Sequence, residues 1–219
     1  MSLDRIRKWI EYWDGNVFFS FSGGKDSWAL ANMVWSIDRD IRACHVRTGL
    51  EYPEINQFVN EVAQSHPVVI LHPKMSYADV IKKYGYPIGS KKVSRELRIL
   101  GQEKDNPKWK NTYHLYDTGY KKDGTFSKGS KLSQCWRKCL SCGFKFSEQC
   151  CDIIKKNPLD EWQKNNGNPK RMTGIMADEG GLRAKRTECS IFESRDPNSA
   201  PMLFWKTEDV WNYLRNNNL

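Results

Sequence analysis

The stretch Phe19-Ser20-Phe21-Ser22-Gly23-Gly24-Lys25-Asp26-Ser27 decides the fold of this 219-residue chain. An apolar run at residues 17–19 precedes it and predicts a buried strand. Apolar residues at i, i+3, i+4 and i+7 follow it and predict a helix: Leu30, Met33, Val34 and Ile37. The stretch is therefore a loop between a strand and a helix. Its paired glycines and the N–H groups at the helix start are typical of an anion pocket.

The polar side chains of this loop suit a phosphate group. Lys25 supplies a positive charge, and three hydroxyls can donate hydrogen bonds: Ser20, Ser22 and Ser27. Asp26 is placed to orient the loop or to help hold a metal such as magnesium. The loop lacks the four-residue spacer and the Gly-Lys-Ser/Thr ending of a Walker loop, so it is a phosphate loop of another kind.

Outside this loop, apolar strand patterns alternate with helical ones, which indicates βαβ units. We expect an α/β fold with a mostly parallel twisted sheet of about five strands and helices on both faces. The further strands are expected at 41–46, 68–71, 171–176 and 202–204, and the helices at 6–13, 55–62, 76–84, 90–100, 151–165 and from Thr207, which would cap the last helix. The prediction is one domain, 1–219, with a polar Cys-rich insertion at 102–149.

Composition narrows the classes of partner and location. A formal net charge of +9 suits a polyanionic partner such as a nucleotide, a sulfated nucleotide or a nucleic acid. No run of 18 apolar residues occurs, so we expect no membrane span and a cytoplasmic protein.

Residues 102–134 show no periodicity and mix lysines with aromatic residues. Such a mixture could bind single-stranded nucleic acid through stacking and phosphate contacts. A mobile flap over the site is favoured on the sequence alone, because loops of this length are commonly lids.

Five cysteines fall within 17 residues, and in a protein that we expect to be cytoplasmic such clustering indicates a metal or iron–sulfur cluster. Cys139 and Cys142 have the usual chelating spacing. The spacing leaves zinc and a 4Fe–4S cluster both open, with these candidate ligands: Cys135, Cys139, Cys142, Cys150 and Cys151. Cys44 lies in a predicted strand and is expected to be buried and inert.

Several segments resemble known families. Residues 22–27 resemble the pyrophosphate-binding loop (PP-loop) of the adenine-nucleotide alpha-hydrolase superfamily. Four further segments, in order, are similar to the phosphoadenylyl sulfate (PAPS) and adenylyl sulfate (APS) reductases: 48–54, 150–159, 176–183 and 201–211. The resemblance implies the fold expected above and an adenine nucleotide (ATP, APS or PAPS) as the small-molecule substrate, with a thiol reductant as a further partner.

The same resemblance and the glycine pattern assign site residues. Lys25, Asp26 and Arg183 are the candidate catalytic groups, and Lys185 and Arg186 are expected to help Arg183 neutralise a phosphate or sulfate. The expected nucleotide-binding set is Ser20, Ser22, Gly23, Gly24, Lys25, Asp26, Ser27, Thr48, Gly49, Gly180, Gly181 and Arg183.

Two departures from the reductases leave alternatives open. The sequence has no Glu-Cys-Gly-x-His segment, which carries the cysteine nucleophile of those reductases, and Glu188-Cys189-Ser190 does not match it. The complete Ser-Gly-Gly-Lys-Asp-Ser loop is closer to the ATP pyrophosphatases. The first reading is a PAPS reductase-like enzyme acting on a sulfonucleotide. The alternatives are an ATP pyrophosphatase that adenylates a substrate, nucleic acid included, for thiolation, and a non-catalytic nucleotide- or nucleic-acid-binding module.

Overall fold

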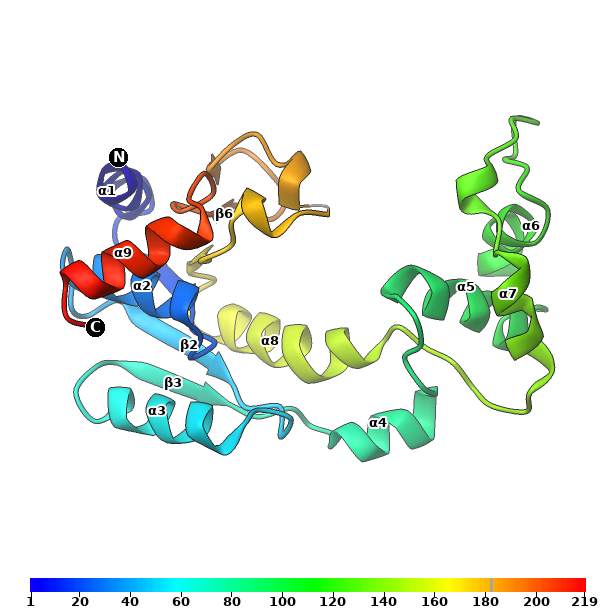
Figure 1. The fold of residues 1–219 in the computed structure, drawn as a ribbon, viewed down its shortest axis with the longest axis horizontal. Coiled ribbons are helices and arrows are strands. Elements are labelled where there is room, and N and C mark those ends of the chain that lie inside the picture. The colour runs from blue at the N-terminus through cyan, green and yellow to red at the C-terminus, as the bar shows by residue number, and fades with distance from the viewer. Residues whose placement is uncertain (182) are drawn as a thin grey trace. The chain divides into compact units, whose positions relative to one another are not determined.

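The computed structural model describes residues 1–181 and 183–219 and has the predicted strand–loop–helix at its centre. Strand β1 spans Val17–Ser20, and helix α2 spans Lys25–Trp35. In the structure the chain divides into two compact units, 1–73 with 157–219 and 74–156 (Figure 1). The predicted division into one domain with an insertion at 102–149 stays a prediction.

The first unit contains a six-stranded sheet in the order β3-β2-β1-β4-β6-β5. The pairs β1–β2, β1–β4, β2–β3 and β4–β6 are parallel, and only β5–β6 is antiparallel, so the predicted mostly parallel sheet is confirmed. Phe19 of β1 lies opposite Ala43 on one side and Met172 on the other. The remaining strands are β2 (Arg42–Val46), β3 (Val68–Leu71), β4 (Lys170–Met172), β5 (Ser190–Ile191) and β6 (Asn198–Ser199).

Two strand predictions in the second half of the chain need correction. Residues 202–204 form a turn and not a strand, and β4 is shorter than the predicted 171–176. Met202 and Leu203 are fully buried, and the Leu203 carbonyl accepts a hydrogen bond from Ala177 N–H. The apolar run therefore reflects burial of a turn, which periodicity cannot distinguish from a short strand.

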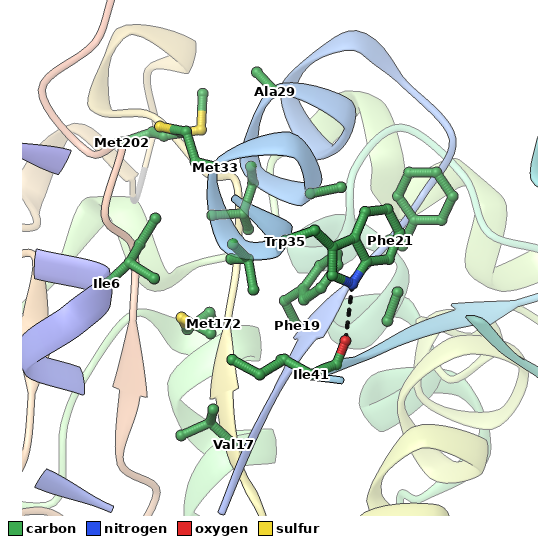
Figure 2. Close-up of a cluster of buried hydrophobic side chains, with 14 of the residues drawn as sticks. Ile6, Val17, Phe19, Phe21, Ala29, Met33, Trp35, Ile41, Met172 and Met202 are labelled. Carbon is green, nitrogen blue, oxygen red and sulfur yellow. Dashed lines mark hydrogen bonds between the residues drawn. The ribbon is translucent and has the colours of Figure 1, made fainter. Parts of the chain in front are cut away.

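Helices cover both faces of the sheet, as predicted. Helices α1 (Ser2–Tyr12), α2, α3 (Pro53–Ala63) and α9 (Thr207–Asn216) contribute to the larger apolar cluster, which Figure 2 shows around Phe19, Trp35 and Met172. The Trp35 indole N–H donates to the Ile41 carbonyl at 2.9 Å within it. Helix α8 (Asn157–Asn165) packs on the other face through Leu159 and Trp162. Pro158 stands at the second position of α8, after a π-helical turn at Asp152–Lys156.

The start of α9 differs from the sequence prediction. Thr207 is the first helical residue and Lys206 is the cap, so Thr207 does not cap the helix. The Asp209 carboxylate accepts the Lys206 N–H at 2.7 Å instead. Among the described residues, no helix is long and apolar enough to cross a membrane.

The second unit is helical and has its own small core. It contains α4 (Tyr77–Tyr84), α5 (Lys91–Gln102), α6 (Lys110–Thr118) and α7 (Gln134–Arg137), and Leu97, Leu100, Leu132 and Phe146 form its core. Helix α6 lies in the stretch that shows no periodicity. None of its residues is fully buried, so no apolar stripe marks it in the sequence.

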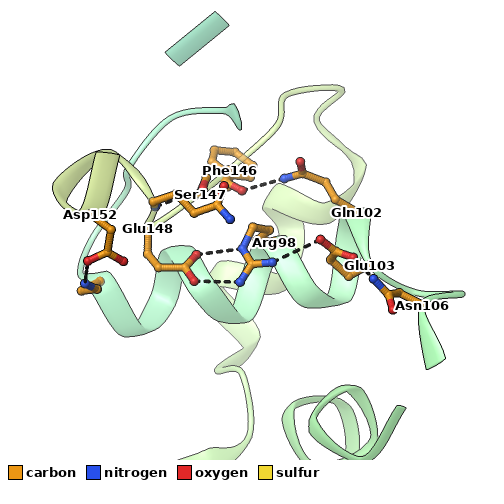
Figure 3. A network of polar contacts seen from close by, with 10 residues as sticks. Arg98, Gln102, Glu103, Asn106, Phe146, Ser147, Glu148 and Asp152 are labelled. Carbon is orange, nitrogen blue, oxygen red and sulfur yellow. Dashed lines mark hydrogen bonds and ion pairs between the residues drawn. The ribbon is translucent and has the colours of Figure 1, made fainter. Parts of the chain in front are cut away.

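A buried ionic network stabilises the second unit (Figure 3). The Arg98 guanidinium donates to both carboxylate oxygens of Glu148 at 2.9 and 2.8 Å and to Glu103 at 3.2 Å. The Gln102 amide donates to the Phe146 carbonyl at 2.6 Å. Because Arg98 and Glu148 are 50 residues apart, this pair fastens the end of the unit's chain onto α5.

Candidate functional site

Three loops adjoin at the carboxyl edge of the sheet, where parallel α/β sheets bind ligands. They follow β1, β2 and β4, and β1 lies between the other two strands. The loop after β4 approaches the β1 loop so closely that a Cβ on Gly174 would lie 2.9 Å from the Asp26 carbonyl oxygen. The three loops therefore begin at one edge of the sheet.

The β1 loop is shaped by its own serine hydroxyls. Ser27 Oγ accepts the Ser22 N–H at 3.1 Å and donates to the Gly24 carbonyl at 2.8 Å. Ser22 Oγ lies 3.0 Å from Ser27 Oγ and accepts the Gly24 N–H at 3.3 Å. These two hydroxyls hold the loop in a closed turn at the start of α2. The third predicted serine, Ser20, is the last residue of β1 and takes no part in these hydrogen bonds.

Glycine is required at one position of this turn. Gly23 has a φ of +80°, and a Cβ there would lie 2.9 Å from Ile55 Cγ2 of α3. Gly24 precedes α2, and no side chain caps that helix. The N–H groups of a helix's first turn have no intrahelical partner, and the helix dipole adds partial positive charge there. The turn therefore presents an electropositive helix start to the sheet edge.

Lys25 and Asp26 form an ion pair at this helix start, with Nζ and Oδ1 2.5 Å apart. Lys25 Nζ also lies 6.0 Å from the ring centre of Trp211 on α9. Trp211 is 46% exposed, whereas Val210 and Leu214 take the buried face of α9. Sequence reasoning predicted only a helix from Thr207 here and missed the place of Trp211 beside the loop. No sequence pattern marks this role, because Trp211 lies next to Val210 and three residues before Leu214, within the arc that the apolar stripe of a helix covers.

The β2 loop is organised by Glu51, which sequence reasoning also missed. One carboxylate oxygen accepts the Thr48 hydroxyl at 2.6 Å and the Thr48 N–H at 3.1 Å, and the other accepts the Gly49 N–H at 3.0 Å. Burial acts to raise the pKa of Glu51, but these hydrogen bonds together hold it below its ordinary value. An ionised Glu51 thus fixes Thr48 and Gly49, the two residues predicted to border a nucleotide.

A buried histidine lies beneath the β1 loop. His45 Nδ1 is 2.9 Å from the Phe21 carbonyl, one residue before Ser22, and the side chain is 2% exposed. Burial lowers the pKa of His45, so the ring is neutral at pH 7 and Nδ1–H donates to Phe21. No sequence pattern marks this residue, because His45 reads as one more position of a strand.

The β4 loop carries Gly180, Gly181 and Arg183, whereas Leu182 lies outside the described residues. The two glycines have positive φ, and the Arg183 guanidinium pairs with the Glu179 carboxylate. Asp178 Oδ2 accepts the Thr207 N–H at 3.3 Å, which ties this loop to the start of α9. Arg183 is thus paired with a carboxylate of its own loop.

Arg186 differs from its predicted role. Its guanidinium donates to the carbonyls of Glu188 and Cys189 at 2.7 and 2.9 Å and to the Asn198 side chain at 2.7 Å. The side chain is therefore used to hold the β5–β6 hairpin, and it is not available to neutralise a ligand. Lys185 is exposed.

The candidate metal ligands all lie in the second unit, and the seven cysteines are free. Cys142 Sγ donates to the Cys139 carbonyl at 2.9 Å, and Cys135 Sγ contacts Ser133 Oγ at 3.0 Å. Cys150 and Cys151 line a cavity of about 250 Å³ beside the start of α5. Within residues 1–181 and 183–219, no three His, Cys, Asp or Glu side chains are grouped to hold a metal. The arrangement described does not fit a metal or cluster, so the five-cysteine ligand set stays a prediction and no chemistry is routed through it.

Comparisons with known proteins agree with this architecture. Residues 16–98 and 106–219 match the family model of the phosphoadenosine phosphosulfate reductase domain. A curated adenosine 5'-phosphosulfate reductase of Oceanobacillus iheyensis is 30% identical over 73 residues, which cover 33% of this chain and 30% of that protein. The structure of a PAPS reductase from Candida auris in complex with phosphate aligns with this chain at a TM-score of 0.56 and 14% sequence identity. The alignment covers 100% of this chain and 81% of the Candida auris chain, and it shows a similar fold.

Proposed function

The chain belongs to the phosphoadenosine phosphosulfate reductase domain family, and from this premise we propose that it binds a sulfonucleotide, APS or PAPS, and acts on its sulfur. The observation that carries the proposal is the junction of three loops around the uncapped start of α2. A helix start of this kind with a lysine at its first residue suits a phosphate group.

Each loop then has a role in the proposed site. The N–H groups at the start of α2 and Lys25 bind the phosphate, and Thr48 and Gly49, fixed by Glu51, border the nucleotide. On the other side of β1, Gly180 and Gly181 allow the backbone to approach the ligand. Arg183 exchanges Glu179 for the sulfate or a second phosphate.

A second function is favoured by the completeness of the β1 loop. All six residues of the Ser-Gly-Gly-Lys-Asp-Ser sequence are present, and the two serines close the turn. That loop resembles the one with which ATP pyrophosphatases cleave ATP between its α and β phosphates. In this alternative the enzyme adenylates an acceptor that is then thiolated.

Calorimetry with APS, PAPS and ATP with magnesium separates these functions. For the sulfonucleotide enzyme we expect APS or PAPS to bind at least tenfold more tightly than ATP, a difference of about 1.4 kcal/mol. A preference for ATP, with release of pyrophosphate once the acceptor is supplied, would establish the second function.

A matched pair of lysine variants tests the site itself. Lys25→Ala should abolish nucleotide binding, because it removes the charge at the helix start. Lys164→Ala removes an exposed lysine from α8, which covers the opposite face of the sheet, and should bind as the unaltered protein does. Undiminished binding by Lys25→Ala contradicts the assignment of the site under either function.

A further inference from the structure

Positive charge is divided unequally between the two units. Residues 74–156 contain 19 Lys and Arg against 8 Asp and Glu, a net charge of +11. The rest of the chain contains 16 against 18, a net charge of −2, so the second unit holds the whole surplus that gives the chain +9. The first unit, which contains the candidate nucleotide site, is therefore mildly acidic. The second unit carries the positive charge that would attract a large polyanion.

Most acidic side chains of the second unit are occupied inside it. Glu148 and Glu103 pair with Arg98, and Asp117 pairs with Arg137. Asp152 accepts from both Lys91 and Lys156. The buried Glu96 carboxylate pairs with Lys92 at 3.6 Å. The acids thus neutralise cations that stabilise the fold, and the excess lysines remain on the surface.

A short hairpin, residues 119–127, combines such lysines with exposed aromatic rings. Tyr120 pairs with Phe126 across it, the Ser127 N–H donates to the Gly119 carbonyl at 2.7 Å, and the Lys121 N–H donates to the Thr125 carbonyl at 2.9 Å. The two rings are 49% and 52% exposed, with centres 5.1 Å apart. Exposed lysines lie at the tip and just after the hairpin: Lys121, Lys122, Lys128 and Lys131.

Trp109 is a less suitable platform for a ligand, although it lies in the same unit. Arg95, Arg98 and Lys108 place their charged groups 5.6, 5.3 and 5.3 Å from its ring centre. Its π-face is therefore occupied by cations of the protein. Tyr120 and Phe126 have no cation–π partner in the described part of the chain, so their rings offer open aromatic surface.

We propose that the hairpin of residues 119–127 and the lysines beside it form a docking surface for single-stranded nucleic acid. The lysines neutralise successive phosphates, and unpaired bases stack on Tyr120 and Phe126. Lysines alone would suit any polyanion, and aromatic rings alone would suit an apolar partner. The combination favours a strand that offers phosphates and exposed bases together. The inference is independent of the proposed nucleotide site, whose loops lie in the first unit.

Fluorescence anisotropy with a labelled 20-nucleotide single strand tests this proposal across a salt series. Lys121→Gln/Lys122→Gln should lower the slope of log affinity against log salt by about 1.4, since each phosphate contact with a single strand contributes about 0.7. The control Lys8→Gln/Lys164→Gln removes the same charge from exposed positions of the first unit and should leave the slope unchanged.

A second pair of variants tests the stacking. Tyr120→Ala/Phe126→Ala should weaken binding at least tenfold with little change in slope, since each stacked base contributes about 1–3 kcal/mol. Tyr120→Phe/Phe126→Tyr keeps both rings and should retain the affinity, which separates loss of stacking from loss of the hairpin.

Three results would overturn the proposal. Equal affinity for duplex and single strand, with alanine variants that bind as the unaltered protein does, would mean a general polyanion contact. Binding to anionic lipid vesicles but not to the oligonucleotide would mean a membrane surface. No binding at low salt would exclude the surface altogether. In every arm, calorimetry with PAPS should give the same affinity for the hairpin variants, so a failure here is distinct from a failure of the nucleotide site.

Discussion

Trp211 on α9 lies beside Lys25 at the start of α2, with the lysine Nζ 6.0 Å from the indole ring centre. The contact joins a residue near the end of the chain to the phosphate loop near its beginning. Tyr213 strengthens the same helix pair, because its hydroxyl donates to the Asn32 side chain at 2.6 Å. The indole therefore forms a side wall for the ammonium that we propose binds the phosphate.

Trp211→Ala should weaken nucleotide binding about two- to fivefold, because an exposed cation–π contact contributes roughly 0.5–1 kcal/mol. Trp211→Phe keeps an aromatic face and should lose less. Calorimetry with PAPS measures both, and Phe204→Ala is the control, since Phe204 is exposed and contacts Arg5 instead. Equal affinities for all three variants would show that the indole does not support Lys25.

The phosphate loop offers a matched pair of glycines. Gly23→Ala should cost about 1–3 kcal/mol of unfolding free energy, because the residue has a φ of +80° and its Cβ would meet Ile55 at 2.9 Å. Gly24→Ala should cost much less, since Gly24 has a φ of −84° and its Cβ would lie 3.5 Å from Ser22 Oγ. Urea unfolding measures the difference, and similar costs at both positions would contradict the strained turn.

The sequence predicts the centre of this fold better than its margins, for physical reasons. β1 and α2 are marked by the apolar run at 17–19 and a full helical stripe, and β3 lies at the predicted 68–71. β5 and β6 have two residues each, too few to show a period. Helix α6 is only partly buried and has no fully buried face. Met202 and Leu203 are buried in a turn, and in the sequence they resemble a short strand.

Some residues of the candidate site can likewise be predicted from the sequence, and others cannot. Loop residues 22–27 carry their chemistry in local sequence, so they can be named without a structure. Glu51 and Trp211 act through partners that only the folded chain brings to them. Arg186 shows the converse, because a cation beside a glycine loop looks free until the hairpin carbonyls around it are known.

Glu51 makes the β2 loop sensitive to acid. Its folded-state pKa lies below the unfolded value, so its stabilisation is complete above the ordinary pKa of about 4.3 and is lost as the pH falls through the folded value. At pH 7, Glu51→Gln should cost about 1 kcal/mol, somewhat below the range for hydrogen bonds to a charged group because the carboxylate is partly exposed.

Urea unfolding at pH 7 and at about pH 3.5 tests this relation. The difference between the unaltered protein and Glu51→Gln should shrink at the lower pH, because Glu51 binds a proton more readily in the unfolded chain than in the folded one. Glu54→Gln, on an exposed position of α3, should show little difference at either pH. A gap of the same size at both pH values would mean that the charge of Glu51 is not what holds the loop.

The last prediction concerns the contribution of the buried ion pair of Arg98 and Glu148 to the stability of the second unit. Both side chains are 8% exposed, so Arg98→Met leaves a carboxylate without its partner in the core of the second unit. We expect a loss of about 3–5 kcal/mol at pH 7. Arg98→Met/Glu148→Leu should recover most of this loss, because apolar side chains of similar size can replace a buried ion pair.

The pH dependence of the unfolding free energy distinguishes the cause of the loss in Arg98→Met. In the unaltered protein, burial acts to raise the pKa of Glu148, and the hydrogen bonds from Arg98 bring it below its ordinary value. Without Arg98, burial is opposed only by a backbone hydrogen bond and the charge of Arg95. We expect the pKa of Glu148 to rise above the unfolded value, so the loss should diminish as the pH falls towards 4 and the carboxyl is protonated. Lys91→Met breaks a half-exposed pair with Asp152 and should change the unfolding free energy by less than about 1 kcal/mol. A loss in Arg98→Met that stays constant with pH would show that the missing packing of the side chain, and not the unpaired charge, destabilises the unit.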